Sequence, residues 1–469
     1  MAKNSRGIQI EKIEAALAKK KPKGYIAYLV LIICLVYITD ELASNICVQM
    51  KTEIATTLFA KFGDSSLAKL EMLGLISYPC IAISLFYRTL ADKLGRKPFL
   101  IINTLGMGLG MFIIYLSPNV FTYILGYCVI SFFVPHDMQV VYIMETAPKE
   151  HRAKIYSIIK CISTLGVMLI PLFRRLFMPE PAAWRSVFLI PAIIGLVSCL
   201  CALLFTSETE AFLTSRLNYL RRCESGALGT VPAAPDAQGG FFAAFKFSMK
   251  HAQLRRLNIL MGLFNMGFII TMYYQVMISY GYAEGLMSAG AFTGISEALA
   301  SVGTNEVTQA LFLFPIGSAL VQLSHGFISD KAGRKTTGII MAVTTVLSFV
   351  GFVAGARLLW SPLVTGFLAG VCIGSFWGYG DINVMMMSES APTNLRSSVL
   401  SSCYVIGVIG TFLGMGILLP LINKFGNSIT ALATLCIAVP GIIASIFVLC
   451  RTHETKGMDL ERITGSEFD

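Results

Sequence analysis

Apolar stretches of roughly 20 residues recur along this chain, and they limit its possible folds more than any other feature. A helix rises about 1.5 Å per residue, so each stretch is long enough to cross a hydrocarbon layer about 30 Å thick. The stretches leave almost no polar face to meet water. Charged residues make up 14% of the chain, whereas a soluble domain carries about a quarter. The sequence therefore predicts an all-α membrane protein with twelve transmembrane helices, at 24–49, 70–88, 98–117, 122–145, 153–173, 184–206, 257–281, 306–329, 338–356, 362–388, 397–420 and 429–450.

The distribution of lysine and arginine predicts which side of the membrane each connecting segment faces. If both termini are cytoplasmic, the inner segments hold 28 of the 37 basic residues and the outer segments hold 8. An excess of this size on one side is the positive-inside pattern of membrane proteins. We therefore expect a multi-pass protein of the cell membrane with both termini in the cytoplasm. The net charge of +10 then reflects topology and the anionic inner leaflet rather than a nucleic-acid partner.

Two charged patterns occur twice in the chain. The heptapeptides ADKLGRK (91–97) and SDKAGRK (329–335) lie 238 residues apart, each in a predicted inner loop. The segments DMQVVYIMETAPKEHR and DINVMMMSESAPTNLR share an aspartate, a glutamate, a proline and an arginine at one common offset of 244. Two independent patterns at nearly the same offset predict two pseudo-symmetric six-helix bundles built from one duplicated unit.

The repeat sets the expected domain boundaries. A cytoplasmic N-terminal tail at 1–23 precedes the first six-helix bundle at 24–206. A central cytoplasmic loop at 207–255 leads to the second bundle at 256–451, and a cytoplasmic C-terminal tail follows at 452–469. The centre of the loop, ESGALGTVPAAPDAQGG, has the composition of a flexible linker.

These motifs together resemble the major facilitator superfamily, in its sugar-porter and organic-ion branch. GFISDKAGRK (326–335) is similar to the family's inner-loop motif, with Ile328 in place of a leucine, and RTLADKLGRK (88–97) departs from the motif at Arg88. The family's E-x-x-P-x-x-x-R element occurs in both halves, and HETKGMDLE is similar to the segment that follows the last span in this branch. The resemblance implies the major facilitator fold and transport by alternating access.

Charged residues at the inner helix ends are the expected gating residues. Asp92 and Asp330 each precede a helix whose N-terminus a carboxylate can cap, and each lies near an arginine, Arg96 or Arg334. Together with the repeated glutamate–arginine pairs they can form inner charge clusters that hold the outward-open state and break when the inner side opens. These pairs are Glu145 with Arg152 and Glu389 with Arg396. The alternative is that the charges serve topology alone.

Polar side chains within the apolar spans are the expected lining of a solute pathway, because a charge inside a membrane is costly unless it faces water. In the first span polar residues recur at helical spacing, and in the fifth a second polar stripe surrounds a lysine. The residues expected to bind solute are Tyr37, Asn45, His136, Lys160, Tyr274, Gln275, Trp377, Tyr379 and Asp381. Those expected to carry the coupling proton are Asp40, Glu41 and Asp137.

The resemblance adds a role for one carboxylate and argues against one substrate class. Proton-coupled sugar porters have an aspartate after a tyrosine in the first span, and Asp40 lies there in VYITDELAS. Lys160 falls where those porters have a glutamine that contacts sugar. In the seventh span Tyr273 and Tyr274 match the family, but apolar residues replace the amides that sugar hydroxyls need, at Leu263, Phe264 and Ile269. The site therefore favours a small charged or zwitterionic organic solute over a hexose.

The sequence predicts a secondary active transporter, and we expect proton-coupled symport. An antiporter that exports organic cations and an uncoupled facilitator remain open, as does a membrane sensor built on the transporter fold. The sequence contains no nucleophile–base pattern, metal-ligand spacing or Walker-type phosphate loop, so we expect no enzyme activity, no metal and no cofactor. The expected partners are a small-molecule solute, protons and membrane lipid, without nucleic acid, and we expect a monomer.

Overall fold

The computed structural model describes residues 2–18, 24–89, 94–134, 142, 146, 152–224, 241–391 and 396–456. Every regular element in these ranges is a helix, which confirms the predicted all-α class. The chain divides into two compact units. The first unit comprises 1–47, 73–167 and 185–232, and the second comprises 48–72, 168–184 and 233–469.

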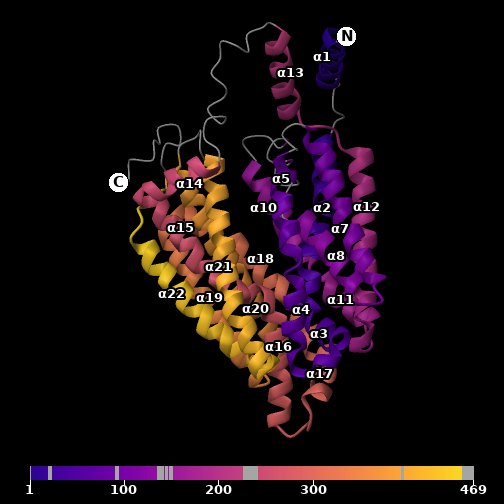
Figure 1. Ribbon diagram of the computed structural model, residues 1–469, viewed down its shortest axis with the longest axis vertical. Helices are drawn as coiled ribbons and strands as arrows, with labels where there is room; N and C mark the ends of the chain where they lie inside the picture. The colour runs from indigo at the N-terminus through magenta and orange to yellow at the C-terminus, as the bar shows by residue number, and fades with distance from the viewer. Residues whose placement is uncertain are drawn as a thin grey trace. The chain divides into compact units, whose positions relative to one another are not determined.

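The first unit consists of helices from the first half of the chain (Figure 1). α7 packs between α8 and α12, and the Thr39 hydroxyl of α2 donates to the Ser198 hydroxyl of α12 at 3.1 Å. The N-terminal helix α1 packs on α13, where Arg221 forms an exposed ion pair with Glu14. The helices are α1 (Ala2–Ala18), most of α2 (Tyr25–Gln49), α5 (Ser77–Thr89), α7 (Arg96–Tyr115), α8 (Val120–Phe133), α10 (Arg152–Gly166), α12 (Leu189–Phe205) and α13 (Glu210–Glu224).

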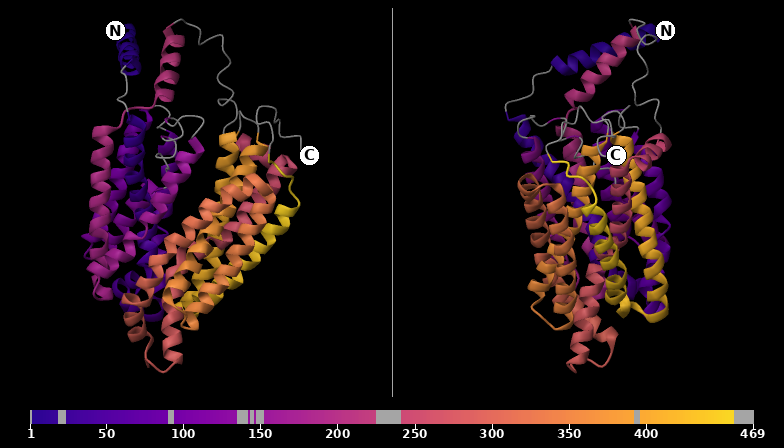
Figure 2. Two further views of the ribbon diagram at one scale, coloured as in Figure 1. Left: turned by 180° about the vertical axis from the view of Figure 1, so that it is seen from behind. Right: turned by 90° about the vertical axis from the view of Figure 1, so that its left-hand side faces the viewer.

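The second unit joins helices from both halves of the chain. Its long helices, α18 to α22, run side by side in both views of Figure 2. From the second half come α14 (Phe241–Lys250), α15 (Ala252–Asn265), η6 (Met266–Phe268), α16 (Ile269–Ser288), α17 (Ile295–Thr304), α18 (Glu306–Ala332), α19 (Arg334–Arg357), α20 (Pro362–Ser390), α21 (Arg396–Phe425), η7 (Asn427–Ile429) and α22 (Thr430–Cys450). From the first half come α3 (Lys51–Leu58), η1 (Ala60–Ser65), most of α4 (Ser66–Gly74) and α11 (Leu169–Phe177). The predicted boundaries of two six-helix bundles stay a prediction.

Within the described residues, nine helical segments are long and apolar enough to cross a membrane. They coincide with the first, third, sixth and all later predicted spans. In the second and fifth predicted spans the helix is interrupted, between α4 and α5 and between α10 and α11. Pro79 and Pro171 lie just after these breaks, and a proline has no N–H to continue the helical hydrogen bonds of the preceding turn. α8 (Val120–Phe133) covers 122–133 of the fourth predicted span. The count of twelve stays a prediction.

Glycines on α20 allow its very close packing against α18. Gly366 and Gly370 lie one turn apart and face the α18 backbone. A methyl group on Gly366 would lie 1.7 Å from the Ala310 carbonyl oxygen, and one on Gly370 would lie 1.9 Å from the Phe314 carbonyl oxygen. Lipid tails give helices no hydrophobic reason to associate, so helices in membranes gain stability from such close backbone contact.

We therefore expect Gly366→Ala to lower the melting temperature of the purified protein, because the methyl group forces α18 and α20 apart. Overpacking of a core usually costs about 1–3 kcal/mol. The matched control is Gly416→Ala on α21, where an added methyl group meets nothing within 4 Å. Alanine is favoured over glycine in a helix by up to about 1 kcal/mol, so the control should unfold at or above the wild-type temperature. Equal melting temperatures for the two variants would contradict this account of the packing.

Candidate functional site

A carboxylate caps the N-terminus of α19 at the end of the second of the two repeated heptapeptides, SDKAGRK. The Glu454 carboxylate accepts the backbone N–H of Arg334 at 2.9 Å and that of Lys335 at 3.0 Å. Gly333 makes room for this carboxylate, since a methyl group added to its Cα would lie 2.7 Å from a Glu454 oxygen. Its φ of 90° also lies in the region that favours glycine. The Lys335 ammonium donates to the Cys450 carbonyl at the end of α22. The glycine, arginine and lysine of the motif therefore join the start of α19 to the end of α22.

The same arrangement recurs in the first unit. The Glu208 carboxylate accepts the backbone N–H groups of Arg96 and Lys97, at 2.9 Å and 3.2 Å, at the start of α7. Gly95 has a positive φ of 111°, and its added methyl group would lie 2.3 Å from a Glu208 oxygen. The Lys97 ammonium donates to the Leu203 and Thr206 carbonyls at the end of α12. Each ADKLGRK-type motif thus ends in a helix N-terminus that a distant glutamate caps.

The structure assigns this cap to Glu208 and Glu454, whereas the sequence prediction assigned it to Asp92 and Asp330. Sequence reasoning missed the two glutamates although a signal existed, since TSET at 206–209 and THET at 452–455 repeat one pattern. Asp92, Glu145, His136 and Asp137 lie outside the described residues, as do the side chains of Arg152, Asp330 and Arg396.

Two of the predicted gating residues do meet in the second unit. The Arg334 guanidinium donates to Glu389 Oε1 at 3.1 Å and 3.3 Å, and to the Ser329 hydroxyl at 2.6 Å. The Thr455 hydroxyl donates to the second Glu389 oxygen. This charged cluster connects α18, α19, the end of α20 and the segment after α22. In the first unit the Arg96 guanidinium lies over the Phe212 ring, 5.7 Å from its centroid.

The capping geometry also sets the ionisation of Glu454, which lies beyond the last helix. Burial by itself raises the pKa of this carboxyl. Hydrogen bonds from the backbone N–H groups of Arg334, Lys335, Lys456 and Thr455 outweigh burial and hold the pKa below its usual value. A carboxylate whose pKa is depressed in the folded state stabilises that state above its unfolded pKa, about 4.3 for glutamate. This contribution is lost as the pH falls through the folded-state pKa.

Glu454→Gln should therefore lower the melting temperature at pH 7, and the difference from the wild type should shrink below about pH 4.3 and vanish once the pH is below the depressed folded-state pKa of Glu454. The measurement is the melting temperature of the two purified proteins across this pH range. Glu180→Gln, which changes an exposed carboxylate of the same unit, is the control and should show no pH-dependent difference. A deficit of equal size at both pH values would mean that the Glu454 charge contributes nothing to the cap.

The predicted polar stripe of the first span is located on α2. Tyr37 and Asp40 are buried, while Glu41 and Asn45 are half-buried. The Asn45 amide donates to the Glu41 backbone carbonyl at 2.9 Å and to its carboxylate at 3.3 Å. Lys160 is half-buried on α10. The first unit thus contains a buried carboxyl group inside an apolar span.

The predicted solute-binding residues of α20 differ in their surroundings. The Tyr379 hydroxyl is hydrogen-bonded to the Ser445 hydroxyl of α22 at 2.9 Å, and the side chain is buried in the helix bundle. Trp377 is 43% exposed, and one turn further on the side chain of Asp381 is 42% exposed. The Asp381 carboxylate lies 3.9 Å from the His325 imidazole of α18. Asp381 and Trp377 are therefore exposed, Tyr379 is engaged in packing, and contact of these residues with a solute stays a prediction.

A buried ion pair that the sequence did not reveal lies near the predicted outer ends of several helices. Arg174 of α11 is fully buried, and its guanidinium forms an ion pair of 2.6 Å with the buried Glu53 carboxylate of α3. The same guanidinium donates to the Gln49 carbonyl and the Gly303 carbonyl, each at 2.8 Å, and to the Thr308 hydroxyl at 3.3 Å. Every nitrogen of the guanidinium therefore has a partner.

Gln275, predicted to bind solute, extends this buried network. Its carbonyl oxygen accepts the Thr52 backbone N–H at 3.1 Å and the Thr52 hydroxyl at 3.0 Å. Its amide nitrogen donates to Glu53 at 3.3 Å and to the Ser279 hydroxyl at 3.0 Å. Tyr274, beside it, is buried and stacks on Phe314. In this structure Gln275 joins α16 to α3, and its contact with solute stays a prediction.

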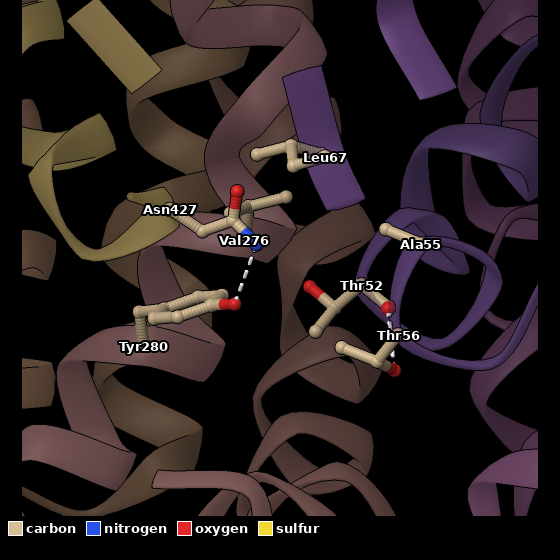
Figure 3. Close-up of a pocket in the computed structure, with 7 residues that line it drawn as sticks. All are labelled: Thr52, Ala55, Thr56, Leu67, Val276, Tyr280 and Asn427. Atoms are coloured by element: carbon tan, nitrogen blue, oxygen red, sulfur yellow. Dashed lines mark hydrogen bonds between the residues drawn. The ribbon is translucent and has the colours of Figure 1, made fainter. Parts of the chain in front are cut away.

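A small, partly open space lies next to this network (Figure 3). The empty volume among its lining residues, including the part open to solvent, is about 140 Å³, whereas pockets for small molecules usually measure about 300–1,000 Å³. Thr52 and Thr56 of α3 lie on one side, and Tyr280 and Asn427, joined by a hydrogen bond of 2.9 Å, lie on the other. The space is too small for an organic solute, so the helices are closed together here.

Comparison with known proteins identifies the family. The model of the Major Facilitator Superfamily matches residues 29–305, more than half of the chain. The chain belongs to this superfamily. Its members are transporters rather than enzymes, so this protein is a multi-pass membrane transporter of a small molecule. The resemblance inferred from the duplicated motifs is thereby confirmed.

Relatives within the superfamily differ in their solutes. The glucose transporter GlcP of Staphylococcus epidermidis is 23% identical over 401 residues, covering 80% of this chain and 83% of GlcP. The cis,cis-muconate transport protein of Acinetobacter baylyi is 25% identical over 359 residues, covering 72% of this chain and 75% of that protein. Among solved structures, the inward-open xylose transporter XylE from E. coli superposes with a TM-score of 0.61 at 15% identity, covering 93% of this chain and 99% of XylE. The latter likeness confirms the major facilitator fold.

Proposed function

We propose that this superfamily member is a secondary active transporter that moves a small polar solute, charged or zwitterionic, by alternating access in symport with protons. The observation that supports coupling best is the burial of Asp40 within the first span. Burial disfavours the charged form of a carboxyl group, so such a group can take up a proton on one side of the membrane and release it on the other. Glu41 and Asp137 are the alternative proton carriers.

The proposed solute class rests on the polar groups of the spans. Lys160 offers an ammonium and Asp381 an accessible carboxylate, whereas apolar residues occupy the positions of the sugar-binding amides. The two relatives named above carry different solutes, glucose and cis,cis-muconate, so membership of the family does not identify the solute. A screen of small metabolites for compounds that raise the melting temperature tests the class directly, since a ligand that binds the folded state stabilises it.

The proposed setting is the cell membrane, with both termini in the cytoplasm and the protein acting as a monomer. The lysine and arginine bias of the sequence supports this orientation. The glutamate caps at the starts of α7 and α19 then lie on the inner side, where the duplicated motifs were expected to act as gates. An antiporter of organic cations is the main competing function, and the test below separates it from symport.

Asp40→Asn should abolish accumulation of the solute but preserve its exchange, because asparagine mimics a carboxyl group that never loses its proton. An inward proton moving down about 100 mV contributes about 2.3 kcal/mol, enough to concentrate a neutral solute about fiftyfold. The measurement compares counterflow with uptake driven by a pH gradient, in proteoliposomes loaded with a solute from the screen. We expect wild-type counterflow and no accumulation.

The other outcomes of this experiment each point to a different function. If Asp40→Asn still accumulates solute on a proton gradient, the coupling residue is Glu41 or Asp137. A wild-type protein that exchanges solute but ignores the gradient is a facilitator, and one that expels solute on an inward gradient is an antiporter. Glu41→Gln is the matched comparison on the neighbouring position of α2, and we expect it to retain accumulation.

We also propose that Asp92 and Asp330 act as inner gating residues, one in each duplicated motif. Asp92→Asn and Asp330→Asn should each slow counterflow at least about tenfold, because loss of the charge weakens an inner charge-assisted cluster. Glu180→Gln serves as the control for a change in charge alone. Wild-type counterflow by both aspartate variants, at equal amounts of protein in the membrane, would reduce these residues to determinants of topology.

A further inference from the structure

The buried ion pair between Arg174 and Glu53, two residues of the first half of the chain, is hydrogen-bonded to groups of the second half. Glu53 lies on α3, directly after the first span, and Arg174 lies on α11, directly after the fifth predicted span. Gln275, which donates to Glu53, belongs to the second half, as do Gly303 and Thr308, which accept from Arg174. These contacts explain why 48–72 and 168–184 group with the second half in one compact unit.

We propose that the Arg174–Glu53 pair, with Gln275, is the outer gate of the transporter, closed in this structure. The proposal rests on the alternating-access function proposed above. An outward-open state must let solute pass between the outer ends of the two halves, and these contacts bridge that boundary. Opening the gate therefore separates the Arg174–Glu53 cluster from Gly303 and Thr308, and Gln275 from Thr52 and Glu53.

Burial gives the ion pair its effect on the closed state. The Arg174 side chain is fully buried and the Glu53 side chain is 4% exposed. Two charges removed from water lose much of their hydration, and they are tolerated only when they are paired and fully hydrogen-bonded. Each guanidinium nitrogen has a partner, and both Glu53 oxygens accept hydrogen bonds, from Arg174 and Gln275. The closed arrangement thus satisfies both charges, and removal of one leaves the other buried without its partner.

A second ion pair supports the same closure. The Lys51 ammonium lies 2.7 Å from the Glu71 carboxylate of α4, and both side chains are at most 10% exposed. The same ammonium lies 4.2 Å from the centroid of the Tyr273 ring on α16, within the range of a cation–π contact. The α3 segment is therefore held against α16 on both sides of Thr52, by Lys51 at Tyr273 and by Glu53 at Gln275. The small space drawn in Figure 3 lies between these same two helices.

The test measures exposure of a cysteine placed behind the gate. Ala55 is 1% exposed and lines the small space between α3 and α16 that Figure 3 shows. The variant Ala55→Cys is purified into lipid nanodiscs, and its rate of reaction with a charged maleimide is measured against the parent chain, whose native cysteines set the background. Adding Glu53→Gln should raise the rate at Ala55→Cys about tenfold or more, because a buried guanidinium without its carboxylate strongly destabilises the closed arrangement.

A double-variant comparison separates the ion pair from a general loosening of the fold. Arg174→Gln should raise the labelling rate in the same way as Glu53→Gln. The combination of both substitutions leaves no unpartnered charge, so it should label more slowly than either single variant. Because a single charged variant can fail to fold, each protein is first checked for a single elution peak and a cooperative unfolding transition. If one single variant does not fold, the combined variant, in which both charges are removed, is compared with the single variant that does fold.

Glu284→Gln is the matched control within the same unit. It breaks the ion pair between Glu284 of α16 and Arg357 of α19, in which the arginine side chain is 58% exposed. Exposed pairs contribute little to stability, so the labelling rate at Ala55→Cys should stay at the starting value.

Two results would overturn the gate. One is a wild-type labelling rate in both folded single variants. The other is a labelling rate in the combined variant that is raised by the product of the two factors by which the single substitutions raise it. The measurement needs neither a solute nor a proton gradient, so it is independent of the proposed symport. If labelling increases but the protein moves no solute, the gate proposal is supported and the transport proposal is contradicted. Unchanged labelling in a protein that does accumulate solute removes only the gate.

Discussion

The hydrocarbon layer supplies no hydrogen bonds, and the rest of this structure depends on that constraint. Backbone groups must be satisfied within each helix, which accounts for the all-helical architecture of the described chain. At helix ends the backbone cannot satisfy all its own hydrogen bonds, because the first N–H groups and the last carbonyls have no partner within the helix. The structure supplies partners from distant segments. Glu454 takes the N–H groups at the start of α19, and Lys335 takes a carbonyl at the end of α22.

This pairing explains what the two duplicated heptapeptides have in common. In both units the glycine of the motif adopts a positive φ, the next two residues present their N–H groups, and a glutamate from the segment after the sixth or the last span accepts them. The two motifs lie 238 residues apart, whereas Glu208 and Glu454 lie 246 apart. The spacing along the chain has changed while the contact has been kept, which indicates that the cap itself, rather than the length of any loop, is the repeated unit.

Properties that depend on long windows of sequence were predictable, and those that depend on single distant contacts were not. Apolar composition over about 20 residues predicted nine of the spans that the described residues contain. The breaks near Pro79 and Pro171 follow from local chemistry, but whether a proline kinks or ends a helix depends on its neighbours. Glu53 and Arg174 looked like ordinary charges at span ends. No pattern in one sequence reveals that residues 121 apart form a buried pair.

The chemistry of the proposed outer gate suits a contact that must both form and break. Replacing a buried ion pair by well-packed apolar groups is often neutral or stabilising, so the pair is not the most stable way to close a helix interface. Charged groups, however, regain hydration when water enters, whereas an apolar interface gains nothing from it. A polar gate built from Arg174, Glu53 and Gln275 is therefore specific when closed and low in free-energy cost when open. An apolar gate of equal area would hold the outer side shut and slow the cycle that alternating access requires.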